Sequence, residues 1–162
     1  MLAGTTDTGY RPRAPFIPFH RRLQRWAVIV AHRRAGKTVA CVNDLIDAAV
    51  SCEKTEGRFA YIAPFFNQAK DIAWTYVKKY TEPLWVGLPN ESELRVDIRA
   101  PKTGSISRIR LYGADNPHRL RGLYLDGVIL DEYGDMSPSV WGEIVRPMLA
   151  DRQGWATFIG TP

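Results

Sequence analysis

The chain has 162 residues, of which 45% are hydrophobic and 24% are charged. This length and composition predict one globular domain with a sizeable core. No apolar stretch approaches the length of a membrane span and the N-terminus lacks the pattern of a secretion signal, so we expect no membrane partner and a cytoplasmic location. The cysteines, Cys41 and Cys52, have neither metal-ligand spacing nor a disulfide framework around them, which fits a reducing compartment.

The positive charge is concentrated in the leading segment. The formal net charge is +5, which favours a polyanionic partner. Residues 1–24 form a predicted basic arm, which contacts nucleic-acid phosphate or a neighbouring subunit, or is a solvated extension. Its arginines are Arg11, Arg13, Arg21 and Arg22, and Arg25 follows directly.

An apolar stretch at residues 26–30 predicts a strand, and the run after it predicts a phosphate-binding loop. In such a loop the backbone N–H groups point at the phosphates, Lys37 neutralises the β and γ oxygens, and the Thr38 hydroxyl ligates Mg²⁺. The loop departs from the usual pattern at Ala31, where glycine is expected. A nucleoside triphosphate is the first ligand predicted; the alternative is a turn with a solvated lysine. The loop comprises Ala31, His32, Arg33, Arg34, Ala35, Gly36, Lys37 and Thr38.

The next elements alternate between helix and strand. Residues 39–50 have apolar side chains at helical spacing and acids on the other side, as expected of an amphipathic helix. Residues 59–63 predict a buried strand that ends at Pro64, and residues 67–80 predict a helix with Asn67 as its cap. The segment therefore begins a βαβα pattern.

Two segments of alternating apolar and polar residues follow, at 94–99 and 107–112. Pro101 and Gly104 lie between them, so the pattern predicts a β-hairpin with one solvated face. The arginines of both segments make that face basic. A loop over residues 113–122 follows the hairpin.

The apolar run at residues 127–130 ends in Asp131 and Glu132 and predicts a buried parallel strand. Ligands of open α/β sheets bind beyond the carboxyl ends of the strands, so Asp131 and Thr38 are expected to converge on one Mg²⁺ ion. Glu132 is placed to orient and deprotonate the water that attacks the γ-phosphate. The alternative is that Asp131 caps the following turn and Glu132 is solvated.

The remaining elements are a predicted helix over residues 139–149 and a last strand over residues 156–159. The sequence ends in Gly160, Thr161 and Pro162. The elements together predict an α/β fold without internal repeats. Transfer to a bound small-molecule acceptor is less favoured than hydrolysis, because a glutamate directly after Asp131 suits activation of water.

Four segments carry a resemblance to the ATPase domain of the large terminase subunit, the DNA-packaging motor of tailed bacteriophages. They span nearly the whole chain, and their combination is more specific than any one of them. They are Arg25-Trp26 leading into the phosphate loop, Ala63-Pro64 to Gln68-Ala69-Lys70, Arg121-Gly122 before Leu130-Asp131-Glu132, and Gly160-Thr161-Pro162.

The resemblance implies a RecA-like P-loop NTPase fold, with a mostly parallel sheet flanked by helices. It implies the class that has an added strand between the phosphate loop and the acidic strand, with glutamate as catalytic base. The ATPase domain then covers residues 25–162, and its cofactors are ATP and Mg²⁺. The nuclease domain of a full large terminase is absent from this sequence, so no nuclease activity is expected from it.

The resemblance also assigns roles to arginines and to one threonine. Arg33 matches the loop arginine that reaches the γ-phosphate within the same subunit. Arg119 or Arg121 matches the arginine that acts on a neighbour's nucleotide, although an arginine before glycine is more often structural. Both would stabilise charge on the transferred phosphoryl group. Thr161 matches the motif that couples hydrolysis to movement.

An adenine-contacting element is expected upstream of the phosphate loop. The candidates are Phe19, His20 and Gln24. The tryptophans are expected to fill the core, and the alternative for Trp26 is that it flanks the base. None of the histidines His20, His32 and His118 shows metal-ligand spacing.

The function implied is an ATPase motor that packages double-stranded DNA into a procapsid in the cytoplasm of the infected bacterial host. The implied partners are DNA, the portal protein, the small terminase subunit and further copies in a homo-oligomeric ring. Two alternatives remain open. A helicase-like nucleic-acid-stimulated ATPase shares the loop and the acid pair, and a non-hydrolysing nucleotide-binding module would use Lys37 and Thr38 but not Glu132.

Overall fold

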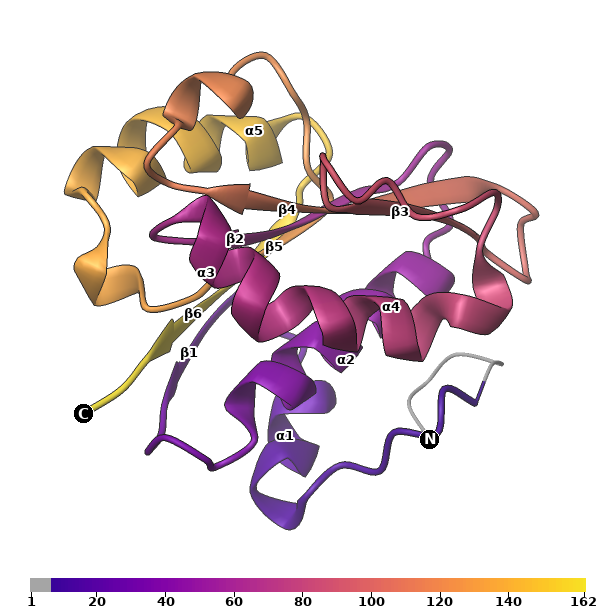
Figure 1. Ribbon diagram of the computed structural model, residues 1–162, viewed down its shortest axis with the longest axis horizontal. Helices are drawn as coiled ribbons and strands as arrows, with labels where there is room; N and C mark the ends of the chain where they lie inside the picture. The colour runs from indigo at the N-terminus through magenta and orange to yellow at the C-terminus, as the bar shows by residue number, and fades with distance from the viewer. Residues whose placement is uncertain (1–6) are drawn as a thin grey trace.

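The computed structural model describes residues 7–162, which form a six-stranded sheet with helices on both faces (Figure 1). The strand order is β1-β6-β5-β2-β4-β3. All neighbouring strands are parallel except β3 and β4, which form an antiparallel hairpin at one edge. The strands are β1 (Trp26–Val30), β2 (Arg58–Ala63), β3 (Arg95–Arg99), β4 (Ile106–Gly113), β5 (Gly127–Leu130) and β6 (Trp155–Gly160).

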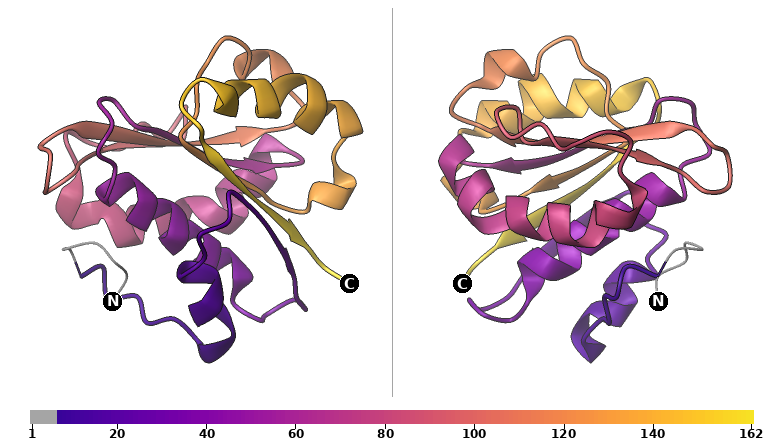
Figure 2. Two further views of the ribbon diagram at one scale, coloured as in Figure 1. Left: turned by 180° about the vertical axis from the view of Figure 1, so that it is seen from behind. Right: turned by 45° about the vertical axis from the view of Figure 1, so that its right-hand side comes forward.

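Helices α2 and α4 cover one side of the sheet and α5 covers the other (Figures 1 and 2). The first side also has α3, which runs through a π-helical turn over Lys70–Trp74 into α4. On the second side, a π-helical segment over Val140–Val145 leads into α5. The helices are α1 (Ile17–His20), α2 (Lys37–Val50), α3 (Phe66–Ala69), α4 (Thr75–Thr81) and α5 (Arg146–Ala150). No helix among residues 7–162 has the length and apolar character needed to cross a membrane.

The central strands are buried on both faces, which explains their continuous apolar runs. On β2, Phe59 and Tyr61 pack into the cluster with α2 and α4, whereas Ala60 and Ile62 pack into the cluster with α5. Because side chains alternate along a strand, one short segment of sequence contributes to both cores. The core therefore lies in two layers, separated by the sheet.

The predicted strands and helices are present, with two differences in detail. Asn67 does not cap its helix: α3 begins at Phe66, and the Gln68 side-chain oxygen accepts a hydrogen bond of 3.3 Å from the Phe65 N–H. The helical patterns of residues 67–80 and 139–149 both contain π-helical segments, at Lys70–Trp74 and Val140–Val145, which the apolar spacing did not predict.

The strand that precedes the phosphate loop lies at the edge of the sheet. Its side chains Val28 and Val30 are 71% and 64% exposed. An apolar run is as compatible with a central strand as with an edge strand, so the sequence pattern does not determine this position. The preceding segment packs against the domain: Tyr10 and Phe16 are buried against Ala40 of α2. Residues 1–6 of the predicted basic arm lie outside the described residues.

Candidate active site

The candidate site lies where the carboxyl ends of β1, β5 and β6 meet. Parallel strands place these ends at the same edge of the sheet, and the segments that follow β1, β5 and β6 are the phosphate loop, the acid pair and Thr161. The added strand expected between the phosphate loop strand and the acidic strand is β6. A cleft of about 840 Å³ opens here, lined by Lys37, Thr38, Asp131 and Glu132 among others.

The phosphate loop has the backbone conformation that its glycine permits. Gly36 has φ +92° and directly precedes α2, so it turns the chain from the loop into the helix. Arg34 also has a left-handed backbone, with φ 67°, a conformation that costs a non-glycine residue about 1 kcal/mol. Gly36, Lys37 and Thr38 line the cleft, so the N-terminus of α2 faces it and favours a bound anion.

The Lys37 ammonium group is held in place by oxygens from two strand ends. Its Nζ donates to the carbonyls of Ala31 at 2.8 Å and Gly160 at 3.2 Å, and to the hydroxyl of Thr161. The nearest carboxylate oxygen, on Glu132, is 3.9 Å away. The charge is thus oriented by neutral acceptors and is poorly compensated, which suits it to bind phosphate.

Asp131 is a buried carboxylate at the end of β5, with 3% of its surface exposed. Burial raises its pKa above the ordinary range, while a hydrogen bond from the Tyr61 hydroxyl acts in the opposite direction. Tyr61 is itself fully buried, and burial, followed by the charge of Asp131, raises its pKa well above the usual value. The phenol therefore stays protonated and donates to the carboxylate.

The donor set suits a magnesium ion. Asp131 and the Thr38 hydroxyl supply two hard oxygen ligands in the same cleft, and Mg²⁺ is commonly held by few protein oxygens together with substrate phosphates and water. Residues 7–162 contain no group of three His, Cys, Asp or Glu side chains arranged to hold a metal ion by themselves. A metal held here would therefore depend on the nucleotide phosphates for its remaining ligands.

Glu132 is placed by an unusual backbone conformation and by Thr161. Its φ of 46° is left-handed, and its side chain remains 35% exposed in the cleft. The Thr161 hydroxyl donates a hydrogen bond of 2.7 Å to Glu132 Oε1. Strained backbone at a cleft is characteristic of functional sites, and here it directs Glu132 away from its buried neighbour Asp131.

Of the predicted arginines, the structure brings only those of the phosphate loop to the cleft. Arg33 and Arg34 are exposed and line it. Arg119 and Arg121 are exposed in the segment between β4 and β5 and do not line it, although Arg119 lines a separate pocket of about 230 Å³. Their position leaves them available to another molecule.

The candidate adenine residues divide into two groups. Phe19, Gln24 and Trp26 line an apolar pocket of about 580 Å³ along β1, which reaches Ala31 and Ala35 of the phosphate loop.

His20 does not line this pocket. Its ring bonds to the Tyr10 hydroxyl at 2.9 Å and to Asp44 at 3.1 Å, so the structure does not bring His20 together with the other adenine candidates. Its side chain instead ties the N-terminal segment to α2.

Two residues of the site were missed by the sequence analysis. The Arg13 guanidinium donates to the Ala35 carbonyl at 2.9 Å and lines the cleft, but no motif marks it among the arginines of the arm. Tyr61 lies in the middle of an apolar strand, where a tyrosine normally signals core packing. Only the pairing of β2 with β5 shows that its hydroxyl meets Asp131.

Comparison with known proteins gives a consistent result. No protein-family profile matches the chain. The large terminase subunit of Thermus virus P23-45 is 31% identical over 168 residues, which cover 95% of this chain and 34% of that protein. The ATPase domain of the large terminase of Thermus phage P74-26 superposes with a TM-score of 0.78 at 29% identity, covering 96% of this chain and 66% of that one.

A large terminase from a thermophilic bacteriophage, solved in complex with ADP, superposes with a TM-score of 0.69 over 83% of this chain and 33% of its own. At 16% identity this likeness shows the fold alone. The chain spans about a third of the length of the curated relatives it matches. The resemblance predicted from the sequence is confirmed, and so is the fold class: a mostly parallel sheet flanked by helices, as in large-terminase ATPase domains with their RecA-like P-loop fold.

Proposed function

We propose that this chain is the ATPase motor domain of a viral terminase large subunit, which hydrolyses ATP to drive double-stranded DNA into a procapsid. The observation that carries the proposal is the convergence of Lys37 and Thr38, from the start of α2, with Asp131 and Glu132, from the end of β5, in one cleft. The similarity to terminase large subunits over 95% of the chain supports the same function. The ADP complex of a related fold supports a nucleotide as ligand.

ATP would bind with its phosphates against the N-terminus of α2. Lys37, already oriented by three oxygens, would neutralise the β and γ oxygens, and Arg33 at the rim of the cleft would reach the γ-phosphate. Mg²⁺, held by the Thr38 hydroxyl and the Asp131 carboxylate, would supply further positive charge to the same oxygens. The adenine would extend toward the apolar pocket lined by Phe19, Gln24 and Trp26.

Glu132 would act as general base. Its carboxylate would accept a proton from water while the water oxygen bonds to the γ-phosphorus and the bond to the β,γ-bridging oxygen breaks, giving ADP and inorganic phosphate. The Thr161 hydroxyl fixes the carboxylate through Oε1. Because Thr161 also accepts a hydrogen bond from Lys37, a change at the phosphates would be transmitted to the segment after β6.

The partners of the motor are also part of the proposal. Double-stranded DNA, the portal protein, the small terminase subunit and neighbouring copies in a ring fit a soluble motor in the cytoplasm of the infected bacterium. The exposed position of Arg119 and Arg121, outside the cleft of their own chain, supports a role for one of them at a neighbour's nucleotide.

The decisive experiment measures ATP hydrolysis and ATP binding for the wild type, Glu132→Ala and Glu132→Gln, with and without DNA. We expect turnover to fall by about 10² to 10⁴ in both variants while ATP binding persists. Binding without turnover in the wild-type chain, even in the presence of DNA, would indicate either that the site needs an arginine from a neighbouring subunit or that the chain is a nucleotide-binding module. DNA unwinding without packaging partners would indicate a helicase-like ATPase, and absence of ATP binding would refute the phosphate-loop assignment.

A further inference from the structure

A second charged pocket lies on the sheet face opposite α2, away from the ATP cleft. It has a volume of about 240 Å³. Three arginines and two tyrosines contribute to its lining, and we refer to these five residues as the arginine pocket. They are Arg58 of β2, Arg108, Arg110 and Tyr112 of β4, and Tyr124 of the segment that leads into β5.

Strand register brings these arginines together. Arg58 pairs with Arg108 across β2 and β4, and Arg110 pairs with Arg95 across β4 and β3. Their strand neighbours Ile109 and Leu111 are buried against the α2 face, so alternation directs the arginines to the opposite face. Like charges directly opposite one another in a sheet are destabilising unless acids or a ligand compensate them.

The acidic side chains of this face compensate only part of the charge. Asp97 accepts two hydrogen bonds from Arg108, at 2.8 and 3.2 Å, and it also pairs with Arg95. Glu93 pairs with Arg95, and its pKa is lowered by the hydrogen bond from Arg95 and by the nearby charge of Arg110. The guanidinium groups of Arg58 and Arg110 nevertheless make no ion pair or hydrogen bond to residues 7–162. The Nε atom of Arg110 is buried without a partner, and its guanidinium carbon lies 4.9 Å from the centre of the Tyr112 ring.

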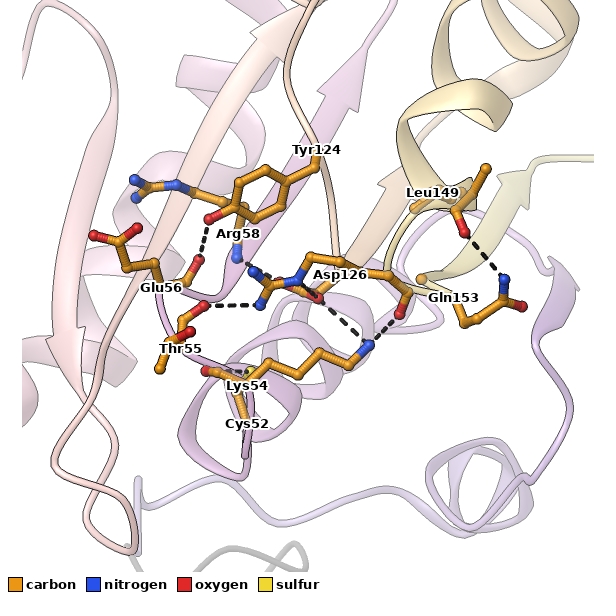
Figure 3. A network of polar contacts seen from close by, with 12 residues as sticks. Cys52, Lys54, Thr55, Glu56, Arg58, Tyr124, Asp126, Leu149 and Gln153 are labelled. Carbon is orange, nitrogen blue, oxygen red and sulfur yellow. Dashed lines mark hydrogen bonds and ion pairs between the residues drawn. The ribbon is translucent and has the colours of Figure 1, made fainter.

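Asp126, which follows the pocket residue Leu125, is already satisfied by other partners (Figure 3). Asp126 accepts hydrogen bonds from the Arg58 backbone N–H and from Arg152, both at 2.9 Å, and Lys54 lies 3.7 Å from it. Figure 3 shows the guanidinium of Arg58 extending away from this network. The Tyr124 hydroxyl donates to the Glu56 carbonyl at 2.7 Å and so fixes the rim of the pocket. Asp126 is thus occupied by other partners, and the guanidinium of Arg58 remains unpaired.

We propose that the arginine pocket binds the phosphodiester backbone of DNA, through Arg58 and Arg110. The planar guanidinium group of arginine can donate two hydrogen bonds to the oxygens of one phosphate. In addition, a buried donor without a partner is stabilised when an anion supplies the missing acceptor. A pocket of this size is small for a drug-sized ligand but admits a single anionic group. Base stacking is not part of the site, because Tyr112 is buried and Arg152 lies over the Tyr124 ring.

The choice of DNA as the polyanion rests on the proposed motor function. The location of the pocket relates this contact to that function. Arg110 and Tyr112 also line the neighbouring pocket that contains Arg119. A phosphate held by Arg110 would therefore lie beneath the segment that carries Arg119 and Arg121. DNA bound there would stabilise one position of the arginines that are candidates for acting on a neighbour's nucleotide.

The test compares DNA binding by the wild type and the double variant Arg58→Gln/Arg110→Gln, followed by fluorescence anisotropy of a labelled duplex at several salt concentrations. Each phosphate contact contributes about 0.9 to the slope of log K against log salt, so the slope should fall in magnitude by about 2. The control, Lys79→Gln/Arg146→Gln, removes the same charge from two exposed side chains outside both the pocket and the basic arm, and should keep the wild-type slope.

Several outcomes would overturn the proposal. An unchanged slope in the pocket variant, or an equal loss in the control, would show that these arginines do not contact DNA. Displacement of DNA by inorganic phosphate at equal phosphate concentration would identify a free anion as the ligand. Arginine-dependent binding of poly-glutamate without any effect on DNA would identify an acidic protein segment instead.

Two further measurements on the pocket variant, its melting temperature and its ATP binding, serve as controls for the DNA-binding result. The melting temperature of the pocket variant without DNA should be equal to or above that of the wild type, because two uncompensated charges are removed. ATP binding should be unchanged, because neither arginine lines the ATP cleft. Failure of the wild type to bind ATP would refute the proposed motor function, whereas the DNA slopes test the arginine pocket separately.

Discussion

The hydroxyl of Thr161 connects the two charged groups of the candidate active site. It donates to Glu132 at 2.7 Å and accepts a hydrogen bond from Lys37. A hydroxyl is suited to this position because it can donate to a carboxylate and accept from an ammonium group at the same time. The end of β6 is thereby linked to both the proposed base and the phosphate-binding lysine.

Replacement of this hydroxyl should reduce turnover more than binding. In Thr161→Val the carboxylate of Glu132 loses its fixed donor, so we expect kcat to fall by about 10- to 100-fold, while the affinity for ATP changes by no more than about 2-fold. Thr161→Ser keeps the hydroxyl and is the control, with turnover near that of the wild type. Steady-state kinetics together with equilibrium nucleotide binding measure both effects. Equal losses in the Val and Ser variants would contradict the role assigned to the hydroxyl.

The buried carboxylate of Asp131 should lower the stability of the ligand-free protein. It should also be required for binding of ADP with Mg²⁺. Since burial raises its pKa, the native state holds the proton more tightly than the unfolded chain, and stability falls as the pH rises through the native pKa. Asp131→Asn should therefore raise the melting temperature at pH 7, and this gain should shrink as the pH falls.

The same variant should lose most of the stabilisation that Mg²⁺ and ADP give the wild type, because one of the two oxygen ligands is weakened. Asp71→Asn is a matched control, as Asp71 lines the same cleft but is exposed. Thermal melts over a pH series, with and without Mg²⁺ and ADP, give both quantities. An Asp131→Asn melting temperature equal to that of the wild type at every pH would argue against a buried charge at this position.

Arg13 should contribute to ATP binding although it lies in the N-terminal arm. It donates to the Ala35 carbonyl and lines the cleft, so Arg13→Gln removes positive charge and a support of the phosphate loop. We expect KM for ATP to rise by about 3- to 10-fold with little change in kcat. Arg11→Gln, whose arginine pairs with Asp7 outside the cleft, should behave as the wild type. An equal effect in both variants would indicate only a general loss of charge.

Arg121 should act on a neighbouring subunit. We expect Arg121→Ala to reduce turnover by about 10³-fold in the assembled motor without loss of ATP binding. Mixing it with Glu132→Ala should partly restore turnover, because a subunit with an intact Glu132 then receives an intact Arg121 from its neighbour. The same mixing with Arg119→Ala distinguishes the two candidates. No recovery in either mixture would argue against an arginine acting between subunits.

The sequence alone determined the element types and the chemistry at their ends. Apolar runs identified the parallel strands and alternating runs identified the hairpin, and the glycine-lysine-threonine loop and the acid pair marked two ends that are proposed to bind the ligand. These features are local: they depend on side-chain periodicity and on residues that lie next to one another along the chain.

Only the tertiary structure decided which of these segments meet. It placed the exposed β1 at the sheet edge, set β6 between β1 and β5, and so brought Thr161 to Glu132. It also directed the Tyr61 hydroxyl to Asp131 and gathered Arg58 and Arg110 on one face. Strand order and register arise from packing between distant segments, and no spacing within one segment encodes them.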